Sequence, residues 1–360
     1  MAAQGTSGRA RASEAPTARG PERGTVVRAV VIAAFFAFVL FGFPALVGVY
    51  WVKVLTAAVI FGIVALGLNL LVGRVGMVSL GQIALLALAS WVAARLFFAT
   101  SLPFPIVLLL AGVITGVIGT LIGLPALRLS GLYLALITLM LAGAIGVVLS
   151  ETDFPNGGGG FLGHTESSSG NPAVRRPSIA EADDAYFRYA VIVSALMLLL
   201  ALAHVRSMPG RAWAAIRQSE PAALAAGVNI TRYKLWAFAL ASFITGIAGG
   251  LLAGNEGKLY TYQFRTIDSV ILLAVVFMGG IFSIWGAVVA GLLQKLLPAL
   301  LNDWGVPPDF LIILFGVGML QVVVTAPGGL VQQLPRDLAR LGRLVVRGVR
   351  RVAGGVGRSS

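Results

Sequence analysis

The sequence contains no cysteine, only two histidines and few charged residues. Without cysteine the chain has no disulfide and no thiol chemistry, and two isolated histidines do not make a metal site. It also lacks a Gly-x-x-x-x-Gly-Lys-Ser/Thr run to hold nucleotide phosphates, since the pair Gly257 and Lys258 is followed by Leu259. We therefore predict no catalytic residues, no metal, no cofactor and no ATP hydrolysis by this chain itself.

Apolar residues, in contrast, dominate the sequence. Hydrophobic residues make up 58% of the 360 positions and charged residues 11%, and the mean hydropathy is +0.91. This composition is typical of an integral membrane protein, in which about 20 apolar residues form one spanning helix. We predict an all-α polytopic membrane protein with about ten transmembrane helices. The apolar stretches are residues 29–49, 54–72, 78–99, 103–127, 131–149, 187–205, 235–254, 267–282, 284–301 and 309–326.

Basic residues are distributed unequally between the two sides of these stretches. With a cytosolic amino terminus, two of the 27 Lys and Arg residues (Arg95 and Lys295) lie within stretches, six lie outside, and the remaining nineteen lie on the cytosolic side. The outer six are Lys53, Arg175, Arg176, Arg188, Lys258 and Arg265. This excess of inner positive charge predicts that both termini are cytosolic. Arg95 is expected to snorkel to the outer end of its stretch.

The stretches and their flanks divide the chain into three parts. Residues 1–26, rich in Ala, Gly, Ser, Thr, Pro and Arg, are predicted to be a disordered cytosolic tail. Residues 27–334 form the membrane domain, which includes an outer loop at 150–186. Residues 335–360 form a basic cytosolic tail that would contact anionic membrane lipid. Nucleic acid is excluded as a partner, because no basic run has interleaved aromatic residues.

A polar, basic loop at residues 206–234 separates two membrane-length stretches. Pro209 and Pro221 each suit the first turn of a helix, and Gly227 is a natural helix stop. Two short helices are therefore expected to lie across the membrane face.

Small residues are concentrated in the second of these helices. Ala222 and Ala223 would let it dock closely into a groove of a partner protein. The alternative is an amphipathic surface helix, with Arg211 and Arg217 holding lipid phosphates.

Polar side chains within the stretches are few. Carboxylates are almost absent there, which argues against proton- or sodium-coupled transport. Six uncharged polar residues are candidates either to line a translocation path or to bond across helices: Asn69, Ser79, Gln82, Thr138, Ser242 and Thr245.

Several blocks of sequence, spread from about residue 60 to 330, resemble one family. They are Leu66 to Gly73, Ser79 to Gln82, Gly123 to Ala135, Gly210 to Arg217, Asn229 to Ala253, and Gly279 to Gly286. Together they resemble bacterial ABC-importer permeases of the branched-chain amino acid type, in the high-affinity M-subunit branch. Neither tail nor the outer loop is covered by the resemblance.

The resemblance assigns the 206–234 loop as the element that couples the permease to its ATPase. Ala222, Ala223 and Gly227 match the family's Ala-Ala pair and following glycine. Pro221 occupies the place of the family's acidic residue, and Glu220 lies one position earlier. Arg211 and Arg217 belong to the same loop.

The resemblance also implies partners, a location and a substrate. The partners are a second permease subunit, two cytosolic ATP-binding cassette subunits and an extracytoplasmic substrate-binding protein, and the location is the bacterial inner membrane. The substrate would be a branched-chain or other hydrophobic amino acid, moved through a near-neutral, weakly polar cavity. Three alternatives stay open: a urea or amide importer, a sugar or nucleoside ABC permease, and a non-ABC secondary transporter or channel.

Overall fold

Apolar sequence folds into α-helices in the part of the chain that the structure, a computed structural model, describes. The described residues are 47–126, 131–151, 174, 176–325, 329–331 and 333. All of them lie in the second of two units, Val47–Ser360, and the first unit, Met1–Leu46, is outside the described residues. The predicted tails 1–26 and 335–360, and nearly all of the first stretch, 29–49, also lie outside them.

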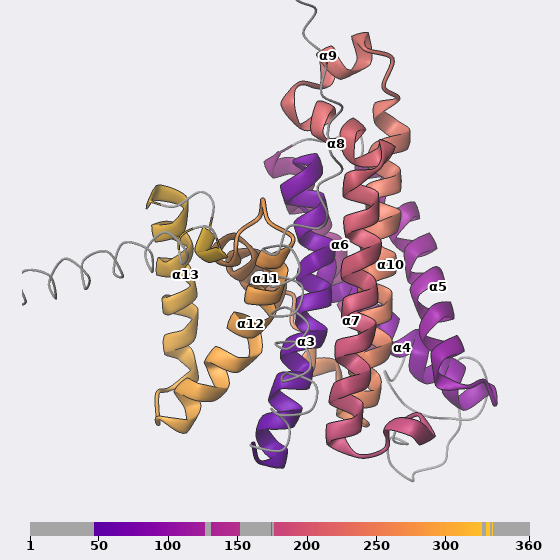
Figure 1. The fold of residues 1–360 in the computed structure, drawn as a ribbon, viewed down its shortest axis with the longest axis vertical. Helices are drawn as coiled ribbons and strands as arrows, with labels where there is room; N and C mark the ends of the chain where they lie inside the picture. The colour runs from indigo at the N-terminus through magenta and orange to yellow at the C-terminus, as the bar shows by residue number, and fades with distance from the viewer. Residues whose placement is uncertain are drawn as a thin grey trace, which may run out of the picture. The chain divides into compact units, whose positions relative to one another are not determined.

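The long helices coincide with the other nine predicted stretches (Figure 1). They are α3 (Val49–Asn69), α4 (Gln82–Ala99), α5 (Phe104–Ala126), α6 (Leu132–Glu151), α7 (Asp183–Arg206), α10 (Ile230–Glu256), α11 (Ile267–Gly279), α12 (Trp285–Asp303) and α13 (Pro308–Thr325). Among the described residues, eight segments are long and apolar enough to cross a membrane, and Phe310–Val324 is a shorter apolar helix. The all-α polytopic membrane fold is thus confirmed, whereas the number of ten spans stays a prediction.

Helix α10 lies at the centre of the unit, in contact with α3, α4 and α5. Glycines allow these close approaches. A Cβ on Gly249 would lie 2.4 Å from the Cβ of Ala89 in α4, and one on Gly246 would lie 2.7 Å from the Cα of Gly112 in α5. Lipid is as apolar as the helices, so the hydrophobic effect does not drive them together. Membrane helices associate instead through close packing at small residues.

Helix α12 packs against α3 in the same way. A Cβ on Gly291 would lie 2.3 Å from the carbonyl oxygen of Ala58 and 2.6 Å from the Cα of Gly62. Both neighbours are backbone atoms, so the two helices would have to move apart to make room for a side chain at Gly291. This contact fixes α12, and with it the helices α11 and α13 that pack beside it.

We expect Gly291→Ala to destabilise the protein by about 1 to 3 kcal/mol, the usual range for overpacking a core. The measurement is thermal unfolding of the purified permease in detergent. Gly316→Ala in α13 is the matched control, because its Cβ would meet nothing within 4 Å. Equal melting temperatures for the two variants would contradict the close α3–α12 contact.

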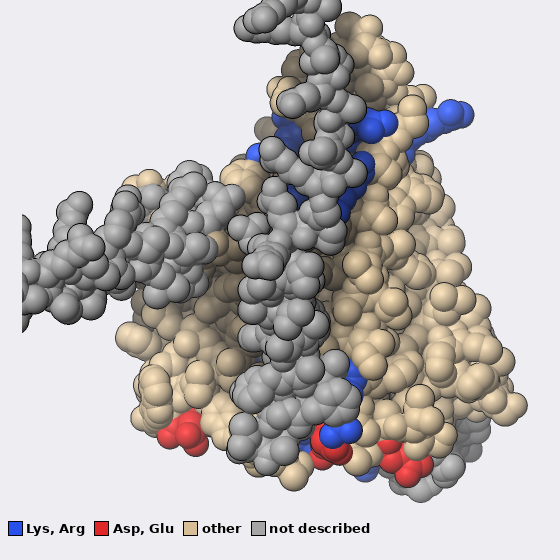
Figure 2. All heavy atoms as spheres, viewed as in Figure 1, with Lys and Arg blue, Asp and Glu red and all other residues tan. Residues whose placement is uncertain are grey.

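The two ends of the helices differ in charge. Figure 2 shows most of the visible Lys and Arg atoms near α8 (Met208–Gln218), whereas the visible Asp and Glu atoms lie at the opposite end. Helix α7 follows this pattern, since it begins with Asp183 and Asp184 and ends with His204 and Arg206. Charges of these signs at these ends also stabilise the helix dipole. The polarity matches the sequence prediction, while the side that faces the cytosol stays a prediction.

Candidate functional site

The predicted coupling loop folds into two short helices at one end of α7 and α10 (Figure 1). They are α8 (Met208–Gln218) and α9 (Glu220–Ala225), and each has a proline in its first turn, as predicted. The Ser219 hydroxyl accepts a hydrogen bond from the backbone N–H of Ala222 and so caps α9. Gly227 follows with a φ of +82°, the left-handed conformation that ends a helix.

Helix α8 is anchored to the chain's own membrane helices. Trp213 is fully buried, and its Nε1 donates to the carbonyl oxygen of Tyr233, 2.8 Å away. Gly210 lets α8 begin directly against α7, because a Cβ there would lie 2.0 Å from the carbonyl oxygen of Val205. Helix α8 is therefore held against the end of α7 and the start of α10.

Arg217, near the end of α8, reaches two membrane segments that are distant in sequence. One guanidinium nitrogen donates to the carbonyl oxygen of Gly73, 2.8 Å away, and the group lies over the ring of Phe282 at 4.4 Å. Gly73 belongs to η2 (Leu70–Val75), a π-helix that continues α3. The chain itself thus engages Arg217, whereas Arg211, which is also exposed and lines the same groove, has a side chain that forms no hydrogen bond or ion pair within the described part of the chain. The lipid-phosphate alternative for Arg217 is not needed to explain its presence.

Glu220 also binds within the chain. Its carboxylate lies 2.6 Å from the Nζ of Lys234, whose side chain is only 7% exposed. This ion pair connects the start of α9 to the start of α10. Because an unpaired buried ammonium is strongly destabilising, we assign Glu220 the task of holding α9 in place.

The orientation of α9 corrects one part of the sequence interpretation. Ala223 was predicted to contact a partner, but it is 2% exposed and packs in the chain's own core. A short helix must bury one side against its own chain, and Ala223 is on that side. The other small residues face outward, and we call this surface the docking face. It consists of the exposed residues Pro221, Ala222, Leu224, Ala225 and Ala226.

A groove runs beside the docking face, between α9 and the start of α10. It is lined by Leu224, Gly227 and Asn229 among others and has a volume of about 630 Å³. Gly227 is exposed, and a Cβ there would meet nothing within 4 Å. Its contribution is therefore its positive φ and the open space it leaves beside Leu224.

The six polar candidates for a translocation path are all at most 3% exposed. One pair bonds from helix to helix, and others bond to segments between helices. The hydroxyl of Thr245 in α10 donates to Oε1 of Gln82 in α4 at 2.7 Å, and the hydroxyl of Thr138 in α6 accepts from the N–H of Leu80 at 2.9 Å. Ser79 accepts from the N–H of Gly81 (3.4 Å), and Ser242 packs where a Cβ on Gly119 would lie. Their role in lining a path stays a prediction.

Asn69, the sixth candidate, holds the turn that joins α11 to α12. Its Nδ2 donates to the carbonyl oxygens of Gly280 (3.2 Å) and Ser283 (3.1 Å). Gly280 has a φ of +118°, and Gly73 approaches the same turn so closely that a Cβ would lie 1.8 Å from the carbonyl oxygen of Ile281. Through Arg217, α8 thus contacts both η2 and this glycine-rich turn.

A cavity of about 640 Å³ lies among α3, α4, α10, α11, α12, α13 and η4 (Thr261–Gln263). It is lined mainly by apolar side chains, together with two acidic and two basic ones: Glu256, Asp268, Arg265 and Lys295. The formal charges of these four groups sum to zero, and the expectation of a near-neutral, weakly polar translocation cavity stays a prediction. None of these four charged residues was predicted as a site residue. Lys295 alone could have indicated the cavity, because it is a charged residue within an apolar stretch.

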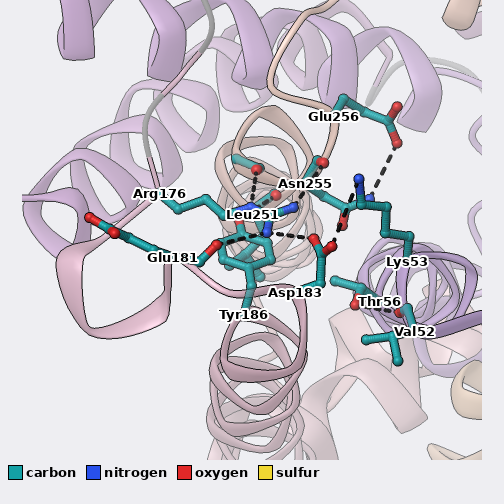
Figure 3. Close-up of polar contacts among 11 residues, drawn as sticks. Val52, Lys53, Thr56, Arg176, Glu181, Asp183, Tyr186, Leu251, Asn255 and Glu256 are labelled. Carbon is teal, nitrogen blue, oxygen red and sulfur yellow. Dashed lines mark hydrogen bonds and ion pairs between the residues drawn. The ribbon is translucent and has the colours of Figure 1, made fainter. Parts of the chain in front are cut away.

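Arg176 fixes the end of α10 that carries Glu256 (Figure 3). Its Nε donates to the carbonyl oxygen of Gly254 (3.0 Å), and its NH1 forms an ion pair with Asp183 (2.6 Å) at the start of α7. The guanidinium also lies 4.7 Å over the ring of Tyr186, whose hydroxyl donates to a carbonyl of α10. A cation at a helix C-terminus is favoured by the helix dipole. Most of the predicted 150–186 loop lies outside the described residues.

Arg95, near the end of α4, is buried. The residue is 3% exposed, and its guanidinium lies 5.9 Å from the centroid of the Trp91 ring. Snorkelling to the outer end of the helix stays a prediction.

The chain is similar to known transport proteins over most of its length. The model of the family described as branched-chain amino acid transport system, permease component, matches residues 50–323. The high-affinity branched-chain amino acid transport system permease protein LivM of Salmonella typhimurium is 29% identical over 85% of this chain and 76% of its own length, and LivM of Escherichia coli K12 is 27% identical over the same shares. The fructose import permease protein FruG of Bifidobacterium longum is 24% identical over 61% of this chain and 65% of its own length.

No solved structure matches the chain significantly. The family match alone includes every long helix from α3 to α12 and nearly all of α13. This chain belongs to the family of permease components of branched-chain amino acid transport systems.

Proposed function

We propose that this chain is the membrane-spanning permease subunit of an ABC importer that carries branched-chain amino acids into a bacterial cell. The observation that carries the proposal is the docking face. Five exposed small or apolar residues lie on α9 and its C-cap, and the Glu220–Lys234 ion pair holds this helix to the bundle. An apolar helix surface presented to water at the end of a helix bundle is suited to a groove on another protein.

The remaining subunits of the proposal follow from the family to which the chain belongs. ATP hydrolysis would belong to two cytosolic ATP-binding cassette subunits that bind the docking face. A second permease subunit completes the pathway. An extracytoplasmic binding protein delivers the amino acid to the opposite end of the helices.

Movement of the ATPase subunits would reach the membrane through Arg217. A displacement of α8 acts on the carbonyl of Gly73 and on the ring of Phe282, and thereby on η2 and on the α11–α12 turn. Two of the helices that line the 640 Å³ cavity, α11 and α12, meet at this turn. These contacts are the proposed route from α8 to the cavity.

Uptake measurements test the function directly. The chain is expressed with its ATPase, second permease and binding-protein subunits in cells lacking their own branched-chain uptake, and labelled leucine and fructose are supplied separately. We expect leucine uptake that requires every subunit. Fructose uptake without leucine uptake would replace the amino acid with a sugar, in keeping with the FruG match. Uptake by this chain alone, independent of ATP, would indicate a secondary transporter.

Orientation is tested with single cysteines, because the natural chain has none. We expect Ser219→Cys, at the start of α9, to react with a membrane-impermeant maleimide only after the cells are permeabilised. Ile179→Cys, 78% exposed and close to the start of α7, should react in intact cells. The reverse result would place the α8–α9 end outside and exclude ATPase docking there.

A further inference from the structure

We infer that the cavity lined by Lys295, Asp268 and Glu256 is a binding site for the zwitterionic amino acid on its way through the permease. Lys295 binds the substrate carboxylate, the two acidic side chains bind its ammonium group, and the apolar walls receive its side chain. The inference rests on the proposed function and adds a site within this chain.

Lys295 lies where a charge is energetically unfavourable. It follows Trp285 by ten residues in α12, which is about 15 Å along the helix axis, and its immediate neighbours are Leu293, Gln294, Leu296 and Leu297. An ionisable group in the middle of a spanning segment is usually functional, because placing it there is unfavourable. Packing alone would be served by another leucine.

The surroundings of Lys295 leave its charge available to a ligand. The side chain is half-buried, lines the cavity and lies with its Nζ 4.1 Å from the centroid of the Phe61 ring. It forms none of the ion pairs within 4.0 Å among the described residues. Glu256 and Asp268 line the same cavity as Lys295. Opposite charges that share a cavity without touching can each bind one end of a zwitterion.

A second polar group supports the assignment independently. Oε1 of Gln294, adjacent to Lys295 and also lining the cavity, is buried and has no hydrogen-bond partner in the described part of the chain. A buried acceptor without a partner is unfavourable by itself. The ammonium group of a bound amino acid would satisfy it.

Size and polarity fit a branched-chain amino acid. A volume of about 640 Å³ lies within the range of small-molecule sites, about 300 to 1,000 Å³. Phe61, Leu86, Leu252 and Phe315 provide an apolar wall. Two acidic and two basic groups give a net formal charge of zero, equal to that of a zwitterion.

Such a site has to bind weakly, because the substrate must leave again. Two of the three charges already have a competing interaction. Lys295 contacts the ring of Phe61, and Asp268 lies 3.3 Å from Arg265, whose side chain is 66% exposed. An exposed ion pair is worth little, so a ligand can displace it, and its re-formation favours release. Transport sites need binding that permits both entry and exit.

The experiment uses the complete importer in proteoliposomes, with Ile271→Cys as a reporter in the permease. Ile271 lines the cavity one helical turn from Asp268. We measure its rate of modification by a small methanethiosulfonate reagent at increasing concentrations of leucine or of fructose. Leucine should slow the modification and fructose should not. Lys295→Gln should raise the leucine concentration needed for half protection about 10- to 100-fold, the usual effect of losing a charged hydrogen bond, and should lower leucine uptake.

Two further variants separate binding from folding. Lys295→Arg keeps the charge and should retain much of the protection, and Lys258→Gln, an exposed lysine outside the cavity, should behave like the parent. Normal leucine uptake without any leucine protection of Ile271→Cys would overturn the inference while leaving the proposed function intact. Unchanged protection in Lys295→Gln would also overturn it. Absence of leucine uptake by the parent importer would instead mean that the proposed function has failed.

Discussion

Leu224→Glu is expected to separate the permease from its ATPase subunits while leaving the permease folded in the membrane. Leu224 is 63% exposed on α9 and is the largest side chain of the docking face. In the complex, a glutamate there would bury a charge without a partner, which is strongly unfavourable. If Leu224 is one of the few residues that dominate the interface, each of which accounts for about 2 to 4 kcal/mol, association should weaken about 30- to 1,000-fold.

Co-purification of the ATPase subunits with detergent-solubilised permease measures this effect, and titration with purified ATPase gives its size. Met208→Glu is the matched control, because it adds the same charge at a 66% exposed apolar residue of α8 outside the docking face. Equal ATPase recovery with the parent, Met208→Glu and Leu224→Glu would mean that α9 is not the docking element.

Ala223→Glu should behave differently, although it changes the adjacent residue. Its side chain is in the chain's own core, so the glutamate would be buried during folding and not during docking. We expect a low yield of folded permease for this variant. The contrast between the two neighbouring positions tests the orientation of α9 as the structure gives it.

The sequence predicts the helices of this protein well and their mutual contacts poorly. Apolar stretches such as 131–149 identify membrane helices, because long hydrophobic runs have few other stable conformations in lipid. Pro209, Pro221 and Gly227 likewise predict the two helices of the coupling loop, since each fixes the local backbone. These features act on the neighbouring backbone, so their effect does not depend on which distant residues come into contact.

Contacts between distant residues have no such signal. Arg217 and Gly73 are 144 positions apart, and nothing near either residue indicates the other. The side of α9 that faces the bundle could not be derived either, because six residues are too few for a periodic pattern. The cavity is assembled from seven separate elements, so only the isolated charge of Lys295 pointed to it.

Arg217→Ala is expected to leave the importer assembled but to lower the amount of leucine carried for each ATP hydrolysed. The substitution removes a hydrogen bond from a charged donor to the Gly73 carbonyl and the contact with the Phe282 ring. Such interactions contribute about 1.5 to 3 kcal/mol and about 0.5 to 1 kcal/mol respectively. Both join α8 to segments that border the membrane interior, whereas the docking face does not include Arg217. We therefore expect transport per ATP to fall about tenfold or more, with ATPase binding unchanged.

Parallel assays of leucine uptake and ATP hydrolysis in proteoliposomes measure this ratio. Arg211→Ala is the matched control, because it removes the same charge from an exposed position of the same helix. Arg217→Lys should fall between the parent and the alanine variant. Lysine keeps the charge but lacks the planar group that donates to one carbonyl while stacking on a ring. If both Arg217→Ala and Arg211→Ala needed no more ATP per leucine than the parent, the contacts of Arg217 would not transmit motion of α8 to the α11–α12 turn. The hydrogen bond from the buried Trp213 to Tyr233 would then be the next contact to test.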